Sequence, residues 1–193
     1  MQGFQDFLVE DKNTHLEHLE DEIINNGTKG AKTAINFLKS VKQMLQGGQG
    51  NTTVSVKWDG APAVFCGINP ENGKFFVGTK SIFNKTPKIN YTNADISRNH
   101  GGALADKLKV CLKYLPSLGI KNVLQGDLLF TSDDKKTAKV AGQQSITFTP
   151  NTITYAVPKV SSGFLGLGGS IYKEIKSAKL GIVFHTSYSG KTM

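Results

Sequence analysis

The stretch VSVKWDGAPAVF, residues 54–65, marks the point where the sequence changes from a helical to a β-type pattern. If these residues form a strand, the two-residue period places Lys57 and Asp59 on one face and Trp58 on the other. Gly60 then lets the chain turn at once, because glycine accepts backbone conformations that other residues avoid. We therefore expect a lysine and a carboxylate to point into the same cleft, beside a tight turn.

Upstream of this stretch, residues 1–50 form the predicted N-terminal helical segment, with helical periodicity at residues 15–46. Apolar residues recur every three to four positions on either side of Gly27, which predicts a pair of helices. His15 and His18 lie one turn apart at the start of the first helix, where they either join Glu22 in a metal site or cap the helix. Capping is the simpler interpretation, because no third ligand is convincing.

Downstream, residues 51–193 form the predicted core. One helix, at 102–114, interrupts a series of short runs rich in Val, Ile, Phe and Thr. Because these runs mostly follow one another without intervening helices, the pattern favours an antiparallel α+β fold over a doubly wound α/β fold. The expected strands lie at 52–58, 62–68, 74–80, 122–130, 145–150, 152–158 and 180–186.

Composition limits the class of protein. The 193 residues include 23 Lys and Arg against 15 Asp and Glu, a formal charge of +8 that favours phosphate polyanions as partners. A chain of this length can bury a self-sufficient core, so Cys66 and Cys111 are expected to be buried free thiols. No apolar run approaches the ~20 residues of a membrane helix and no signal pattern opens the chain, so we expect a cytoplasmic protein with no membrane partner.

Several short motifs carry a resemblance to a known superfamily. Lys57-Trp58-Asp59-Gly60 resembles the KxDG motif of the covalent nucleotidyltransferases, which include ATP-dependent DNA and RNA ligases and mRNA capping enzymes. Segments similar to the superfamily's later motifs follow in the expected order, and the similarity extends over about two thirds of the chain. The whole chain is also similar to uncharacterised tailed-phage proteins with a ligase-like domain. The later motifs are Gly78-Thr79-Lys80-Ser81 (Ia, in the lysine-bearing form of RNA ligases), Gln125-Gly126-Asp127-Leu128-Leu129 (III), Thr154-Tyr155-Ala156 (IIIa) and Leu180-Gly181-Ile182-Val183-Phe184 (IV).

The resemblance implies a fold, a reaction and a set of site residues. The fold would be that of a ligase adenylation domain. Lys57 would attack the α-phosphate of ATP, with Mg²⁺ or Mn²⁺, to form lysyl-AMP, and AMP would then pass to the 5′-phosphate end of an RNA or DNA strand. The remaining nucleotide-binding residues would be Asp59, Gly60, Lys80 on the phosphates, Asp127 on the ribose, Tyr155 on the base, Lys179 and Lys191.

The chain departs from the superfamily pattern in three places. Leu180 occupies the position of the motif IV carboxylate, which helps to hold the catalytic metal, so the metal ligands are not defined by the resemblance. Pro62 replaces a frequent arginine. Motif V, a lysine pair that grips the α-phosphate, would follow motif IV, and Lys191 lies near its expected position without a partner lysine. We therefore expect a core that stops before motif V.

The sequence leaves alternatives open for the protein and for single residues. The first expectation is a ligase-like enzyme with RNA ends as substrate, and the alternative is a catalytically impaired phage module that binds nucleotide or nucleic acid; a capping-type guanylyltransferase would differ mainly in the base. Lys80 could be a solvated lysine and Tyr155 a core aromatic. Asp127 lies in an apolar run, where an unpaired carboxylate is costly, which favours a functional or hydrogen-bonded role. His185 either contacts a phosphate or metal or is a hydrogen-bonded strand histidine.

Overall fold

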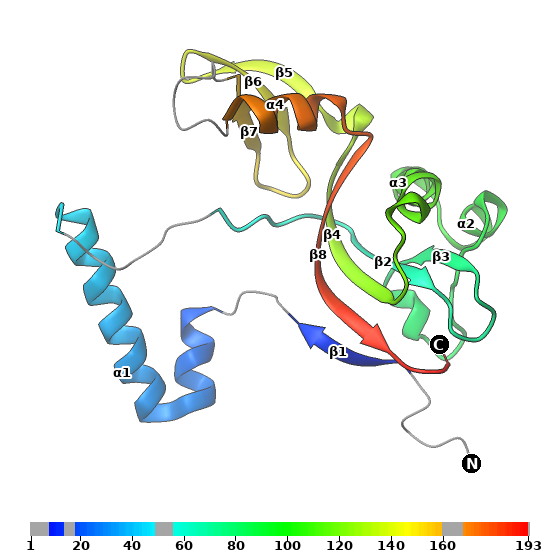
Figure 1. Cartoon of the computed structure of the whole chain (residues 1–193), viewed down its shortest axis with the longest axis horizontal. Coiled ribbons are helices and arrows are strands. Elements are labelled where there is room, and N and C mark those ends of the chain that lie inside the picture. The colour runs from blue at the N-terminus through cyan, green and yellow to red at the C-terminus, as the bar shows by residue number, and fades with distance from the viewer. Residues whose placement is uncertain (1–7, 14–17, 49–55, 160–167, 193) are drawn as a thin grey trace. The chain divides into compact units, whose positions relative to one another are not determined.

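The computed structural model describes residues 8–13, 18–48, 56–159 and 168–192 (Figure 1). The chain divides into two units, His15–Lys57 and a second unit that combines Met1–Thr14 with Trp58–Met193. The second unit contains antiparallel sheets and helices, which confirms the predicted α+β class.

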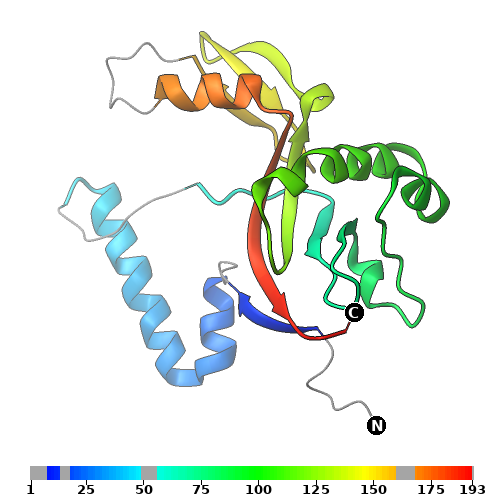
Figure 2. The same cartoon turned by 45° about the vertical axis from the view of Figure 1, so that its right-hand side comes forward.

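The larger sheet has five strands in the order β1-β8-β4-β2-β3, and each neighbouring pair is antiparallel. The long strands β4 and β8 run side by side in both views (Figures 1 and 2). The first strand, β1, lies within the part expected to be helical. The strands are β1 (Val9–Asn13), β2 (Ala63–Ile68), β3 (Phe75–Gly78), β4 (Val123–Thr131) and β8 (Leu180–Ser189).

Helices α2 (Asn93–Asn99) and α3 (Gly102–Tyr114) pack on one face of this sheet. Burial of their apolar side chains against alternate strand residues accounts for much of the stability of the unit. Cys66 and Cys111 belong to this cluster as free thiols, as predicted, and burial raises the pKa of each to about 12. The buried cluster comprises Val64, Cys66, Val77, Ile96, Ala105, Leu108, Cys111, Leu115 and Leu128.

A smaller sheet of three antiparallel strands follows β4. It consists of β5 (Lys136–Val140), β6 (Gln143–Phe148) and β7 (Tyr155–Pro158), and α4 (Gly168–Ser177) packs against it. Lys135 Nζ donates to the carbonyls of Ile175, Lys176 and Ala178 at 2.7, 3.0 and 2.6 Å, which ties the C-terminal end of α4 to the start of β5.

The unit His15–Lys57 consists mainly of α1 (Leu19–Leu45), which is interrupted at Gly27 with φ of +53°. The predicted pair of helices with a break at this glycine is confirmed. The second half folds back on the first so closely that a Cβ on Gly30 would lie 1.9 Å from the Glu22 carbonyl oxygen. Glycine at this position therefore permits the close approach of the two halves.

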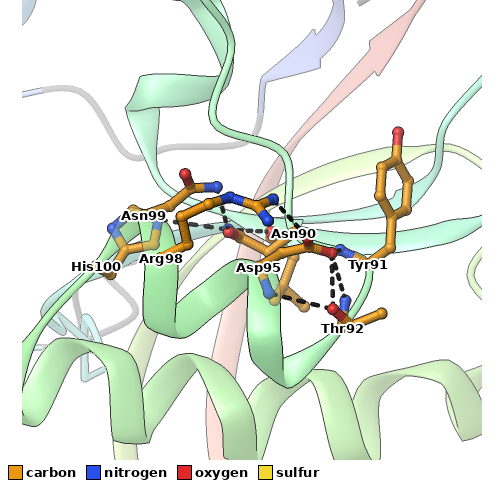
Figure 3. A network of polar contacts seen from close by, with 8 residues as sticks. Asn90, Tyr91, Thr92, Asp95, Arg98, Asn99 and His100 are labelled. Carbon is orange, nitrogen blue, oxygen red and sulfur yellow. Dashed lines mark hydrogen bonds and ion pairs between the residues drawn. The ribbon is translucent and has the colours of Figure 1, made fainter.

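A polar network connects α2 to the edge of β3 (Figure 3). Asn90 is fully buried, and its Nδ2 donates to the Val77 carbonyl at 2.9 Å and lies 3.3 Å from His100 Nε2. Its Oδ1 accepts from Asn99 Nδ2 at 2.9 Å. The contacts with the Val77 carbonyl and with His100 both use the Asn90 Nδ2 amino group, which can only donate. His100 Nε2 must therefore accept, which requires an imidazole with no proton on Nε2.

We predict that this network makes the stability of the fold depend on pH. Burial, and secondarily the charge of Lys88, lowers the pKa of His100. A base whose pKa is lower in the folded state binds fewer protons there than in the unfolded chain, so its stabilising contribution is present above the unfolded pKa and is lost below it. The free energy of unfolding should therefore fall as pH decreases below about 6.5. Urea denaturation between pH 8 and pH 5 measures this, and H100Q should flatten the dependence; an equally steep dependence in H100Q would contradict the assignment.

Candidate functional site

The residues that directly follow Lys57 are held by aromatic contacts. Val56–Gly60 contains no strand, so the prediction that Lys57 and Asp59 share one strand face is wrong. The Trp58 ring lies 4.9 Å from that of Tyr155 and 6.2 Å from that of Phe148, between ring centroids. The Asp59 backbone N–H donates to the Tyr155 hydroxyl at 2.8 Å. Trp58 thus packs against aromatic residues of β6 and β7, and its segment does not pair as a strand.

The next residues dock on the backbone of β4. The Ala61 N–H donates to the Leu128 carbonyl at 3.0 Å, and the Leu128 N–H donates to the Pro62 carbonyl at 3.1 Å. A Cβ on Gly60 would lie 2.6 Å from the Leu128 carbonyl oxygen, closer than ordinary contact allows. The close approach explains why the KWDG motif has a glycine at position 60. Because glycine has no side chain, this segment can lie against β4.

We predict that Gly60→Ala displaces this segment. Overpacking of this kind costs about 1 to 3 kcal/mol, and urea denaturation measures the loss. Gly101→Ala is the matched control, because a Cβ on Gly101 would have no atom within 4 Å. Equal stability of the two variants would contradict the close approach at Gly60.

Asp127 lies in the middle of β4, on the face opposite α2 and α3. It pairs with Ala63 on β2 and Val183 on β8, and its neighbour Leu128 points into the helix-covered cluster. Because successive side chains of a strand alternate, the Asp127 carboxylate points to the other face. Its side chain is 18% exposed.

A β-bulge brings His185 to the same face. Gln125 pairs with Thr186 and Gly126 pairs with Phe184, which leaves His185 as an extra residue on β8. A bulge of this kind directs neighbouring side chains to one side of the sheet. Accordingly His185 Nδ1 lies 2.7 Å from the hydroxyl of the next residue, Thr186, and His185 Nε2 lies 3.7 Å from Asp127 Oδ1.

Polar and aromatic side chains continue along this face from Asp127. The Tyr188 hydroxyl donates to Gln125 Oε1 at 2.6 Å. The rings of Phe65, Phe83 and Tyr188 contact one another with centroids 5.2 to 5.7 Å apart, and Phe83 is 44% exposed. The face therefore offers a polar centre beside a partly exposed aromatic surface.

The three remaining lysine candidates are all exposed but lie in different places. Lys80 lies just beyond β3, which ends at Gly78, and is the first residue of a short 3₁₀ helix, Lys80–Phe83. Lys179 precedes β8 and Lys191 follows it. A strand of this length separates its ends by roughly 30 Å, so one phosphate group does not contact both.

Comparison with known proteins identifies the group to which the chain is related. Residues 13–193 match the model of a family of unknown function, DUF6267. The chain belongs to this family. No curated protein and no solved structure matches it. Within the described residues, no helix is long and apolar enough to cross a membrane.

Several residues of the site were not evident from the sequence. Asn151 Nδ2 donates to Asp59 Oδ2 at 3.2 Å, and Thr186 and Gln125 join the polar centre through the contacts above. In the described part of the chain, no group of three or more His, Cys, Asp or Glu side chains is placed to bind a metal. His15 lies outside the described residues, so the histidine pair near the N-terminus stays a prediction.

Proposed function

We propose that the chain is an ATP-dependent, ligase-like nucleotidyltransferase that transfers AMP to 5′-phosphate ends of a nucleic acid, with RNA as the first candidate. The observation that carries this proposal is the docking of the KWDG segment on β4, next to the strand position of Asp127. The Ala61 N–H and the Pro62 carbonyl both form hydrogen bonds with Leu128, so the end of this segment lies beside the residue that follows Asp127.

Covalent geometry limits where the nucleophile can be. The Cα atoms of Lys57 and Asp59 are at most about 7 Å apart, because consecutive Cα atoms are separated by about 3.8 Å. Asp59 itself is held by Tyr155 and Asn151. In the proposed step a Lys57 Nζ–P bond forms, the bond from phosphorus to pyrophosphate breaks, and Lys57 gives up a proton. Lys80, an exposed lysine just beyond the end of β3, would offset negative charge on the phosphates.

The reaction calls for a divalent cation, which would neutralise part of the triphosphate charge when bound. The position of the motif IV carboxylate is occupied by Leu180, which packs against the helix-covered cluster. That position faces apolar side chains and does not fit a cation. Asp127 and His185 provide a carboxylate and an imidazole on the opposite face, and they are the residues that fit.

A second function is favoured by the same Leu180. A chain that binds ATP or nucleic acid through this face without forming lysyl-AMP would need neither the motif IV carboxylate nor motif V. Such a protein would be a binding module of a phage, and the test below separates it from the enzyme.

We predict that the protein incubated with ATP and Mn²⁺ gains the mass of one AMP on Lys57, as an acid-labile phosphoramidate. Intact-protein mass spectrometry and peptide mapping measure it. K57R should form no adduct, because a guanidinium stays protonated and cannot attack phosphorus. K74R, which changes an exposed turn lysine, is the matched control and should retain the adduct.

Two outcomes would reject the proposed enzyme. An adduct of equal yield in K57R would place the nucleophile elsewhere. ATP binding by calorimetry with no adduct in the wild-type protein would support the binding module instead.

A further inference from the structure

The Asp127 carboxylate is an incompletely compensated charge. Its side chain is only 18% exposed, and among the described residues it forms one ion pair, in which His185 Nε2 lies 3.7 Å from Asp127 Oδ1. That separation is too long for a hydrogen bond. Within the described residues the carboxylate has no hydrogen bond and no lysine or arginine partner. A carboxylate in this position is costly unless something compensates its charge.

The β-bulge supplies an imidazole with a defined orientation. His185 Nδ1 lies 2.7 Å from Thr186 Oγ1, and either atom can be the donor. In the tautomer in which Nδ1–H donates to this hydroxyl, the lone pair of Nε2 faces Asp127. Two electron-rich atoms would then face each other, an arrangement that a cation between them stabilises. Histidines that bind metals characteristically donate their other N–H in this way, which fixes the ring and its tautomer.

We propose that Asp127 and His185 bind one divalent cation of the Mn²⁺ or Zn²⁺ class, with Thr186 as a positioning residue. A tetrahedral site with metal–ligand distances of about 2.0 to 2.1 Å holds its ligand atoms about 3.3 Å apart. The 3.7 Å between Asp127 Oδ1 and His185 Nε2 exceeds this only slightly, so small side-chain rotations suffice.

The two ligand types determine the class of cation and the open positions. An imidazole beside a carboxylate suits Mn²⁺ or Zn²⁺, whereas Mg²⁺ prefers oxygen ligands. Two protein ligands leave the remaining positions for water or for phosphate oxygens. The proposal that Asp127 and His185 bind a cation does not depend on the proposed enzyme activity. That this cation also contacts a nucleoside triphosphate rests on the proposed function.

The test is a titration of the metal-free full-length protein with MnCl₂ alone, without nucleotide, in which electron paramagnetic resonance measures free Mn²⁺. We expect one bound equivalent. D127N and H185Q should each weaken binding by at least tenfold, and T186V should weaken it about tenfold, as loss of a residue that orients a ligand does. D133N changes an exposed carboxylate outside the site and should bind Mn²⁺ as the wild type does.

A second measurement needs no variant of the site. In the NMR spectrum of the wild-type protein, substoichiometric Mn²⁺ should broaden the imidazole resonances of His185 before those of His100. Absence of Mn²⁺ binding, or preferential broadening of His100, would overturn the proposal. So would equal affinity in the wild type and H185Q, because the pair would then be held by a proton on Nε2 and not by a metal.

The two proposals fail separately. Mn²⁺ binding that needs His185, in a protein that forms no adduct on Lys57, would reject the enzyme and retain the cation site. An adduct on Lys57 with Mn²⁺ binding that is unaffected by H185Q would do the reverse.

Discussion

The antiparallel pairing of β4 with β8 is the constraint on which the rest of the larger unit depends. Two bulges break its regular alternation. At one, Leu129 is extra on β4, and both it and Phe130 pack into the cluster around Phe148. At the other, His185 is extra on β8 and shares a face with Thr186. A regular ladder would send each of these neighbours to opposite faces. The first bulge thus places two side chains in the core that packs against the smaller sheet, and the second places two in the polar centre of the larger sheet.

Close backbone approach is the second requirement of the site. A Cβ on Gly126 would lie 2.5 Å from the Val183 carbonyl oxygen, and one on Gly60 would lie 2.6 Å from that of Leu128. Both glycines border the row of Asp127, one within β4 and one in the segment that forms hydrogen bonds with Leu128. Because the KWDG segment is fixed by backbone bonds and by the Trp58 ring, its position does not depend on a ladder of its own.

Periodicity was sufficient for the elements whose packing follows from their own pattern. The strands β2, β4, β6 and β8 and helix α3 were predicted because each buries one stripe of apolar residues. Helix α2 was not, since it has only seven residues, although Thr92 and Asp95 form a capping box that the sequence displays. The KWDG segment was misassigned because its apolar residues contact a distant hairpin, which local alternation does not reveal.

The candidate site could be predicted in its residue types and less well in its geometry. Asp127 was singled out because a carboxylate in an apolar strand needs compensation. Its actual neighbour depends on a one-residue bulge, and nothing local in the sequence distinguishes a bulged strand from a regular one. Lys179 and Lys191 were both predicted to contact the nucleotide, because each is basic and lies near a motif. In the structure the whole of β8 separates them.

The distribution of positive charge links the fold to the chemistry. The net charge of +8 can attract a polyanion from a distance, but that attraction is spread over the surface and is screened within about 10 Å at moderate salt. Charge that acts on one phosphorus atom must come from groups beside it. Lys80 lies just beyond the end of β3, and Lys179 and Lys191 lie at opposite ends of β8. In the proposed enzyme, local compensation at this face would come from Lys57, from Lys80 and from the cation that we propose between Asp127 and His185.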